Sequence, residues 1–279
     1  MRRLTAYPGA DVARPTPLLR ILPVHLYAGR AHVLMERLVR AYRRSWMVIA
    51  SGFFEPLFYL FAMGNGLGSL IGPVSTAAGP VQYAAYIAPA LLATSAMNGA
   101  ILDSTNNVFF KMKHAKLYDG MLATSLGPVD VALGEIIWSL VRGGLYSGTF
   151  VLVMLGLGLL TSWWALLAVP LALVIAFGFA AVGMAVTSYM KTFQHLQWVN
   201  IALLPMFLFS TTFYPLGVYP RPIQLLVECL PLYHGIELMR GLCLGLVTSG
   251  LFLHVFYFLA MIVAGLLVTS RRLEKLLLR

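Results

Sequence analysis

Residues 105–130 read TNNVFFKMKHAKLYDGMLATSLGPVD, and long apolar runs lie on both sides of them. The stretch carries three lysines within six residues. Phe109, Met112 and Leu117 recur at about the helical period, so they fall near one side of a helix. The pattern predicts a short basic helix, at about residues 107–120, held at a membrane surface between two spans. Such a helix is accessible to another protein on that side of the membrane.

The composition is that of an integral membrane protein. Hydrophobic residues make up 59% of the chain and charged residues 11%, and the mean hydropathy is +0.82. Soluble domains have about 45–50% apolar and about 25% charged residues. Several runs reach the ~20 apolar residues that a helix needs to cross the hydrocarbon core. They do not alternate as the ~10-residue strands of a membrane β-barrel do. The expected fold is therefore all-α.

Six membrane-spanning helices are expected, together with one apolar stretch that is interrupted. The six expected spans are residues 45–67, 82–102, 131–155, 165–190, 196–213 and 250–270. Prolines and charged residues break the stretch 214–248, which favours short helices that dip into the outer leaflet. Glycines 64, 66 and 68 are expected to end the first span, and an uncharged loop then runs to Val81.

The N-terminal part divides into a tail and a basic helix. Residues 1–23 are rich in proline and are expected to form a cytoplasmic tail. Residues 24–44 have helical periodicity, with arginines on one face that include Arg37, Arg40 and Arg44. This pattern indicates an amphipathic helix that lies in the interface and contacts anionic lipid headgroups. A solvated cytoplasmic helix is the alternative.

The basic residues predict the orientation in the membrane. The net charge is +10, and 17 of the 20 lysines and arginines fall on one side of the expected topology. They are nine arginines before residue 45, the three lysines of the quoted stretch, Lys191, and four residues of the tail 271–279. Lys and Arg gather in cytoplasmic loops, so both termini are expected in the cytoplasm. This distribution explains the positive charge without nucleic acid.

Sequence signatures of enzymes are missing. The chain contains no G-x-x-x-x-G-K-[ST] phosphate-binding loop, no His-Glu-x-x-His and no Cys/His set with zinc spacing. We therefore expect no catalytic residues, no metal and no cofactor bound by this chain.

Ionisable residues inside spans are candidates for function, because each costs a few kcal/mol to insert. Glu55, next to Pro56, lies about ten residues into the first expected span. A structural kink and a role in a substrate path are equally good readings of it. Glu135 and Arg142 are seven residues apart and share one helical face. Pairing with other helices is the alternative to a transport role, and Asp103 is expected to cap the next helix.

Cys229 and Cys243 are the two cysteines of the chain, and both fall near the expected outer face. They either form a disulfide or act as two small, apolar side chains that fill space in the fold.

Short pieces of sequence across residues 30–275 resemble one family of transport proteins. The pieces are Glu55-Pro56 with LFYLF and the glycines 64–68, Met112-Lys113 to Asp119, LATSL at 122–126, GEIIW at 134–138, FYPL at 213–216 with Pro220, and LPLYH at 230–234 with Glu237 and Arg240. Their order and spacing resemble the permease subunits of type-2 ABC exporters. The most similar branch contains nodulation-factor exporters and daunorubicin-type drug-resistance permeases. Ser125 departs from this pattern, because the family often has Pro there.

The resemblance implies an assembly in the bacterial plasma membrane. Two six-span permeases, as a homo- or heterodimer, would form the path for an amphipathic drug, a lipid or a lipid-linked glycan. Two separate ATPase subunits would bind ATP and Mg²⁺ on the cytoplasmic side. The basic segment would contain the coupling helix that contacts them, through Phe110, Lys113, Lys116, Leu117, Tyr118 and Asp119. Leu117 and Tyr118 would be the main anchor, since exposed ion pairs contribute only ~0–1 kcal/mol each.

The resemblance also implies roles for the other conspicuous segments. The helix 24–44 would be the interfacial connecting helix, and 214–248 the re-entrant helices that close an outer gate. Candidates for the translocation path or gate are Glu55, Pro56, Glu135, Arg142, Pro231, His234, Glu237 and Arg240.

Two other classes of protein remain as alternatives. An ion- or proton-coupled secondary transporter would use Glu55, Glu135 and Arg142, but no inverted repeat is evident. A membrane-embedded enzyme would need a catalytic constellation, which the sequence lacks.

Overall fold

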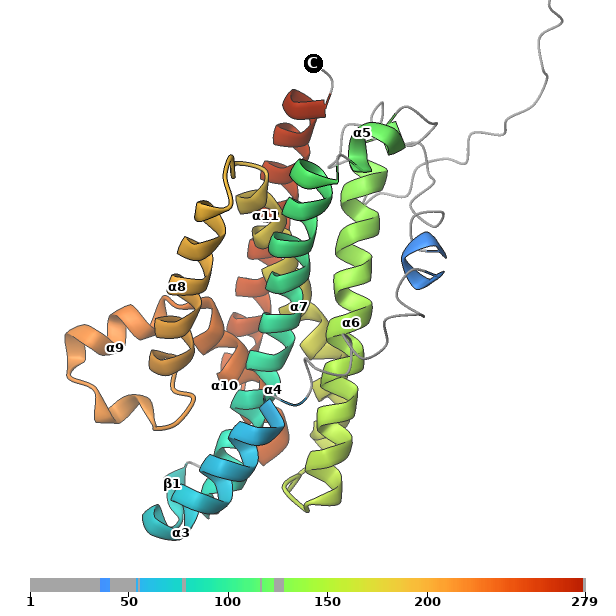
Figure 1. The fold of residues 1–279 in the computed structure, drawn as a ribbon. Coiled ribbons are helices and arrows are strands. Elements are labelled where there is room, and N and C mark those ends of the chain that lie inside the picture. Colours follow the sequence, from blue (N-terminus) through green and yellow to red (C-terminus); the bar gives the residue numbers. More distant parts are fainter. Residues whose placement is uncertain are drawn as a thin grey trace, which may run out of the picture.

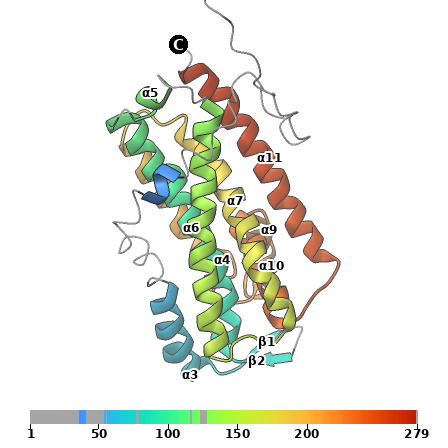
Figure 2. The same ribbon diagram turned by 90° about the vertical axis from the view of Figure 1, so that its right-hand side faces the viewer.

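The protein is a bundle of helices with one small hairpin (Figure 1). The computed structural model describes residues 36–40, 54, 56–76, 79–115, 117–122 and 128–277. The long helices are α4 (Tyr83–Leu102), α6 (Pro128–Gly156), α7 (Ala168–Thr187) and α11 (Gly250–Leu277). A shorter helix, α10 (Pro231–Leu244), packs among α4, α7 and α11. In Figure 2, these long helices run side by side.

Helix α4 forms the centre of the bundle because it is apolar on every side. A helix without a polar face is stable only where other helices surround it. Its alanines let the neighbours approach closely, and Ala88, Ala93 and Ala96 are completely buried. At Gly99, an added Cβ would lie 3.1 Å from the Tyr146 ring of α6. The helices α6, α7 and α10 pack around it.

The sequence indicated that the basic segment forms a separate helix, but in the structure it does not. Helix α4 continues through the π-helical turns η4 (Asp103–Asn107) and η5 (Phe110–His114), so one helix runs from Tyr83 to Lys113. The helix break comes at Ala115, and the short α5 (Leu117–Leu122) follows. The polar run at 103–107 was expected to end the span.

Side-chain hydrogen bonds explain why that polar run stays helical. Ser104 Oγ donates to the Ala100 carbonyl at 2.7 Å, and Thr105 Oγ1 donates to the Ile101 carbonyl at 2.6 Å. These bonds satisfy the hydroxyls within the helix itself. Widened π turns of this kind are frequent at functional sites.

Four helices within the described residues are long and apolar enough to cross a membrane. They are Tyr83–Lys113, Asp130–Gly156, Trp163–Thr187 and Gly250–Arg272, the third beginning with the turn η6 (Trp163–Leu167). They correspond to the second, third, fourth and sixth expected spans. Helix α11 continues beyond its expected end at residue 270, since no helix-breaking residue occurs there. Most of the expected tail 271–279 is therefore helical.

The first expected span is described only in its second half. An apolar helix runs from Pro56 to Ile71 and includes η3 (Leu60–Leu67) and α3 (Gly68–Ile71). The glycines at 64–68 do not end it. An added Cβ on Gly64 would lie 3.1 Å from Ala84 Cβ, so this glycine allows a close contact with α4. The helix ends at Gly72, whose φ of 75° suits glycine. The hairpin β1 (Val74–Thr76) and β2 (Gly79–Val81) replaces the expected loop.

Helix α8 and the broken stretch complete the fold. Helix α8 (Gln194–Phe209) lies at the side of the bundle in Figure 1. The stretch 214–248 contains the short helices η7 (Leu216–Val218), α9 (Arg221–Glu228) and α10, which agrees with the expected interruption by prolines. Helix α5 and the C-terminal end of α11 lie at one end of the bundle, and α3 with the hairpin lies at the other (Figure 1).

Candidate functional site

Two buried ion pairs lie near the end of the bundle where α5 is found. In the first pair, Lys111 Nζ lies 2.6 Å from Glu135 Oε2. The phenol of Tyr118 donates to the other oxygen of Glu135 at 3.1 Å. The Glu135 side chain is only 3% exposed and that of Lys111 is 17% exposed. One carboxylate thus connects the end of the long α4 helix, the short α5 and the span α6.

The second pair lies two turns further along α6. Arg142 Nη1 lies 2.5 Å from Asp103 Oδ1, and both side chains are buried. Arg142 Nη2 also donates to the Tyr146 hydroxyl at 2.8 Å, and Asn107 donates to Asp103. Buried charges are stable when they are paired and hydrogen-bonded in this way. Together the two pairs form the α5-end cluster, which consists of Asp103, Asn107, Lys111, Tyr118, Glu135, Arg142 and Tyr146.

The cluster confirms one expectation and corrects two. Glu135 and Arg142 pair with side chains outside α6, as expected in the alternative to a transport role, and their partners differ. Asp103 was expected to cap a helix, but it is the partner of Arg142. Lys111 belongs to the basic segment that was expected to contact another protein, but it is paired with Glu135 within the chain. The opposite charges of Asp103 and Arg142 were a signal that sequence reasoning did not use.

The expected coupling residues are divided between the surface and the interior. Phe110 and Lys113 are exposed, and the Phe110 ring lies 5.9 Å from that of Phe193. Tyr118 was expected to anchor in a groove of a partner, but it is 3% exposed and bonded to Glu135. Its hydroxyl donates a hydrogen bond inside the chain, which stabilises a buried phenol. Leu117 is half-buried. Lys116 lies outside the described residues, as does the side chain of Asp119.

Only one turn of the expected interface helix is described. Residues 36–40 are helical, with Leu38 buried and both Arg37 and Arg40 exposed. Arg40 pairs with Glu36 at 3.2 Å on the surface. The alternation of a buried leucine and exposed arginines is that of an amphipathic helix. Arg44 and Glu55 lie outside the described residues.

Two histidines meet where α10 approaches the beginning of α11. The Nδ1 atoms of His234 and His254 are 2.7 Å apart, so one ring donates a proton to the other. The Tyr257 ring stacks on His234, with 4.0 Å between the ring centroids. Burial, followed by the nearby His254, lowers the pKa of His234 from 6.5 to about 4. His234 is therefore neutral at neutral pH.

Arg240 joins three segments near this pair. Its guanidinium donates to Glu237 at 2.7 Å and to the Thr211 carbonyl at 2.8 Å, and it lies 4.0 Å from the centroid of the Tyr86 ring. Thr211 has a φ of 62°, a strained conformation for a β-branched residue. The hydrogen bond from Arg240 supports that strained turn after α8. We call this group, with Tyr86, Thr211, His234, Glu237, Arg240, His254 and Tyr257, the histidine cluster.

Pro231 and the cysteines complete the residues singled out in the broken stretch. Pro231 is the first residue of α10, where proline is favoured because its missing N–H needs no partner. Cys229 is exposed and Cys243 is buried, and both thiols are free. Burial raises the pKa of Cys243 to about 12.

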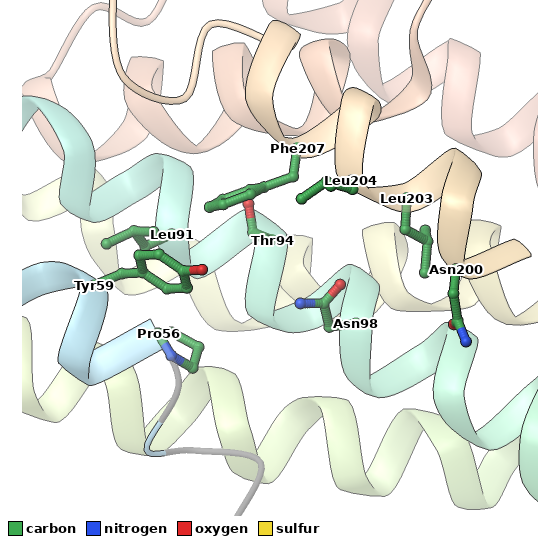
Figure 3. A pocket seen from close by; sticks show the side chains of 9 residues that line it. All are labelled: Pro56, Tyr59, Leu91, Thr94, Asn98, Asn200, Leu203, Leu204 and Phe207. Carbon is green, nitrogen blue, oxygen red and sulfur yellow. The ribbon is translucent and has the colours of Figure 1, made fainter. Parts of the chain in front are cut away.

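A cavity of about 190 Å³ opens between the helix Pro56–Ile71, α4 and α8 (Figure 3). We call it the lateral cavity. Its lining residues are Pro56, Tyr59, Leu91, Thr94, Asn98, Asn200, Leu203, Leu204 and Phe207. An apolar cavity of about 610 Å³ adjoins it and shares Tyr59, Leu204 and Phe207. Of the path candidates that the structure describes, only Pro56 lines the lateral cavity. Sequence reasoning missed Thr94, Asn98 and Asn200, which are polar residues within apolar runs.

No group of three or more His, Cys, Asp or Glu side chains that could hold a metal ion occurs among the described residues. The α5-end cluster and the histidine cluster instead connect side chains of different helices.

The fold and the sequence together define the class of this protein. It is a multi-pass membrane transport subunit, and residues 30–244 match the family described as "ABC-2 type transporter". The chain belongs to that family.

Its relatives include proteins named "Nodulation protein J". The one from Rhizobium leguminosarum bv. viciae is 31% identical over 227 residues, which cover 81% of this chain and 86% of that protein. The one from Rhizobium leguminosarum bv. trifolii is 32% identical, with 81% and 85% covered. The one from Sinorhizobium fredii is 30% identical, with 78% and 85% covered.

Proposed function

We propose that this chain is the permease subunit of an ATP-driven exporter. Its cargo is an amphipathic drug, a lipid or a lipid-linked glycan, which it moves out of the cytoplasm or the inner leaflet. It works with two separate ATPase subunits and with a second permease, either a second copy or a homologous chain. Family membership supports transport, and a sequence without a phosphate-binding loop is consistent with ATP hydrolysis in a partner.

The proposed topology has six spans in a bacterial plasma membrane, with both termini cytoplasmic. Four are the helices that are long and apolar enough. Residues 45–71 and helix α8 supply the other two, and α9 and α10 are re-entrant on the outer side. The basic residues of the chain favour this orientation, because lysines and arginines gather in cytoplasmic loops.

The single observation that carries the proposal is the link from Tyr118 through Glu135 to Lys111. Closure of an ATPase dimer on ATP would push on the surface formed by α5 and the adjoining end of α4. Phe110 and Lys113 are exposed there and would make the contact. Tyr118 passes the displacement to Glu135, and so to α6 and α4 together. The ATP-bound state then shifts the population between inward- and outward-open states of the path.

Two of the three residues assigned to the ion-coupled alternative are paired within the bundle, and the third, Glu55, lies outside the described residues. That mechanism needs carboxylates that face the transported ion. Glu135 is paired within the bundle, Arg142 is paired with Asp103, and neither lines the lateral cavity.

The test is to co-express the chain with a candidate ATPase and to map the contact by crosslinking. Lys113→Cys should crosslink to the ATPase in membranes. The control, Trp163→Cys, is 90% exposed but lies between α6 and α7, far along α6 from α5, and should not crosslink. Reconstituted transport should require ATP. Transport that persists without any ATPase and collapses with the proton gradient would refute the proposal.

A further inference from the structure

The beginning of α10 is held against α11 by contacts that converge on one histidine. His234 Nδ1 lies 2.7 Å from Nδ1 of His254, and the ring of His234 stacks on Tyr257. The Tyr257 hydroxyl also donates to the carbonyl of Cys229 at 3.2 Å. Helix α9 projects from the bundle in Figure 1, and the chain returns through Cys229 to α10. These contacts therefore join the start of α10 and the end of α9 to α11.

The distance between the two rings allows one N–H between them. At 2.7 Å, one Nδ1 must donate and the other must accept, because two N–H groups would point their hydrogens at each other. The backbone of Glu228 accepts a hydrogen bond from the ring of His234. Since Nδ1 of His234 faces His254, that bond uses Nε2–H. His234 Nδ1 is then the acceptor, and His254 is the donor.

One added proton fits this arrangement, and a second does not. A protonated His254 still donates its Nδ1–H to His234, so the contact remains. Protonation of His234 as well makes both Nδ1 atoms donors and places two positive charges in contact. Burial, followed by His254, lowers the pKa of His234 from 6.5 to about 4, which agrees with a contact that opposes this proton. Full protonation therefore requires the rings to separate.

The charged groups around the two histidines are already paired with one another. Glu237 of α10 acts on His254, but its carboxylate accepts a hydrogen bond from Arg240 at 2.7 Å. The carboxylate of Glu228, in α9, lies 3.9 Å from Arg221. The sequence of α7, which also packs on α10, contains no titratable residue. The remaining titratable neighbours are uncharged at acidic pH, and they are Tyr86 of α4, Cys229, Tyr233 and Tyr257.

Protons can reach the two histidines from the surface of the protein. His234 is 8% exposed, His254 is half-buried, and Cys229 at the start of the same contact is exposed. In the proposed topology, α9 and α10 lie on the outer side of the membrane. The protonation of this contact then follows the pH of the outer solution.

We propose that His234 and His254 form an acid-sensitive latch, in which protonation of both rings from the outer side releases the beginning of α10 from α11. Protons bind the released state more tightly, so acidification shifts the population toward it. The segment of α9 and the first turn of α10 moves away from α11 in that state. The effect on export rests on the proposed function, but the latch itself can be tested on the isolated permease.

The experiment measures the distance between α11 and the residue that precedes α10. The full-length permease is placed in nanodiscs of zwitterionic lipid, without ATPase or nucleotide. Spin labels are attached to Cys229 and to Phe256→Cys, which are exposed positions, and Cys243→Ala removes the other thiol. On acidification from about pH 7.5, the distance should increase reversibly by about 2 Å or more, the scale of helix shifts between packed states. The midpoint should lie between about pH 4, the pKa of His234 in the contact, and about 6.5, that of a free histidine.

Matched variants assign the response to the latch. His234→Gln keeps a neutral hydrogen-bonding side chain that does not titrate, so the distance should stay at its neutral-pH value throughout. His254→Gln should behave in the same way. His195→Gln is the control, because His195 is exposed near the start of α8 and bonds to Thr192, and it should retain the wild-type transition. At about pH 7.5, all three variants should elute like the wild type and show its distance.

Two results would overturn the latch. A wild-type distance that does not change with pH would show that protonation does not release α10. A transition that persists when His234→Gln and His254→Gln are combined would assign the pH response to other groups. Failure of the chain to associate with any ATPase would instead refute the export proposal, and it would leave these distances unchanged.

Discussion

Replacing Glu135 should reveal how the α5-end cluster holds the protein together. Glu135→Leu leaves Lys111 and the Tyr118 hydroxyl without their shared acceptor. Removing one partner of a buried ion pair costs about 3–5 kcal/mol. Because Lys111 is 17% exposed and its flexible stem can move toward water, the lower limit of about 3 kcal/mol is expected.

A double-mutant cycle tests that magnitude. Lys111→Met with Glu135→Leu replaces the pair by apolar side chains of similar size, which is often neutral or stabilising. The double variant should therefore recover most of the lost stability, with an interaction energy of about 3 kcal/mol or more, because each single variant leaves one charge unpaired. Reversible unfolding in mixed micelles, followed by circular dichroism, measures the free energy of unfolding of all four proteins.

The same four proteins distinguish stability from coupling. In the complex with its ATPase, the double variant should be stable and yet show weaker cargo-stimulated hydrolysis, because α5 has lost its connection to α6. Additive losses of stability in the cycle would refute the ion pair. Wild-type cargo stimulation in the stable double variant would refute the role of Glu135 in coupling.

Three further predictions concern the histidine cluster and the packing of α11. The pKa of His234 is about 4 in the folded protein and about 6.5 in the unfolded chain, so between these pH values the unfolded chain binds more protons. The free energy of unfolding should therefore fall as pH drops from about 6.5 to 4. His234→Gln should reduce this loss, as measured by unfolding at a series of pH values. Arg240→Met leaves the strained turn at Thr211 unsupported and should cost about 1–3 kcal/mol in the same unfolding assay. Gly265→Ala should cost about 1–3 kcal/mol, because its Cβ would lie 2.7 Å from the backbone of α7, whereas the open position of Gly148 should accept alanine without loss.

Span positions could be predicted because apolar length is a local property of the chain. The expected span 131–155 lies within α6, and the expected start at residue 250 is that of α11. The prolines of 214–248 likewise predicted short helices, since proline cannot continue a helix from its interior. Hydropathy and proline positions need no knowledge of neighbouring helices.

Hydropathy and proline positions could not predict that the helix continues through residues 103–107. The polar run at 103–107 has the composition of a loop, yet it is helical, and its buried Asp103 is paired with Arg142 of α6. That contact joins residues 39 positions apart. A sequence shows which charges need partners but not which ones meet. The inward orientation of Tyr118 depends in the same way on Glu135.

Helix α4 connects all three candidate sites, and this arrangement gives the proposed mechanism a physical path. Near its beginning, Tyr86 contacts Arg240 of the histidine cluster; at its midpoint, Asn98 lines the lateral cavity; at its end, Lys111 binds Glu135. Most of this helix is packed against its neighbours, and packed interiors shift between discrete arrangements and do not deform continuously. The π turns at 103–107 and 110–114 interrupt this regular helix only beyond Asn98. A displacement at α5 would therefore be absorbed partly there, and the remainder would move the cavity and the histidine cluster together.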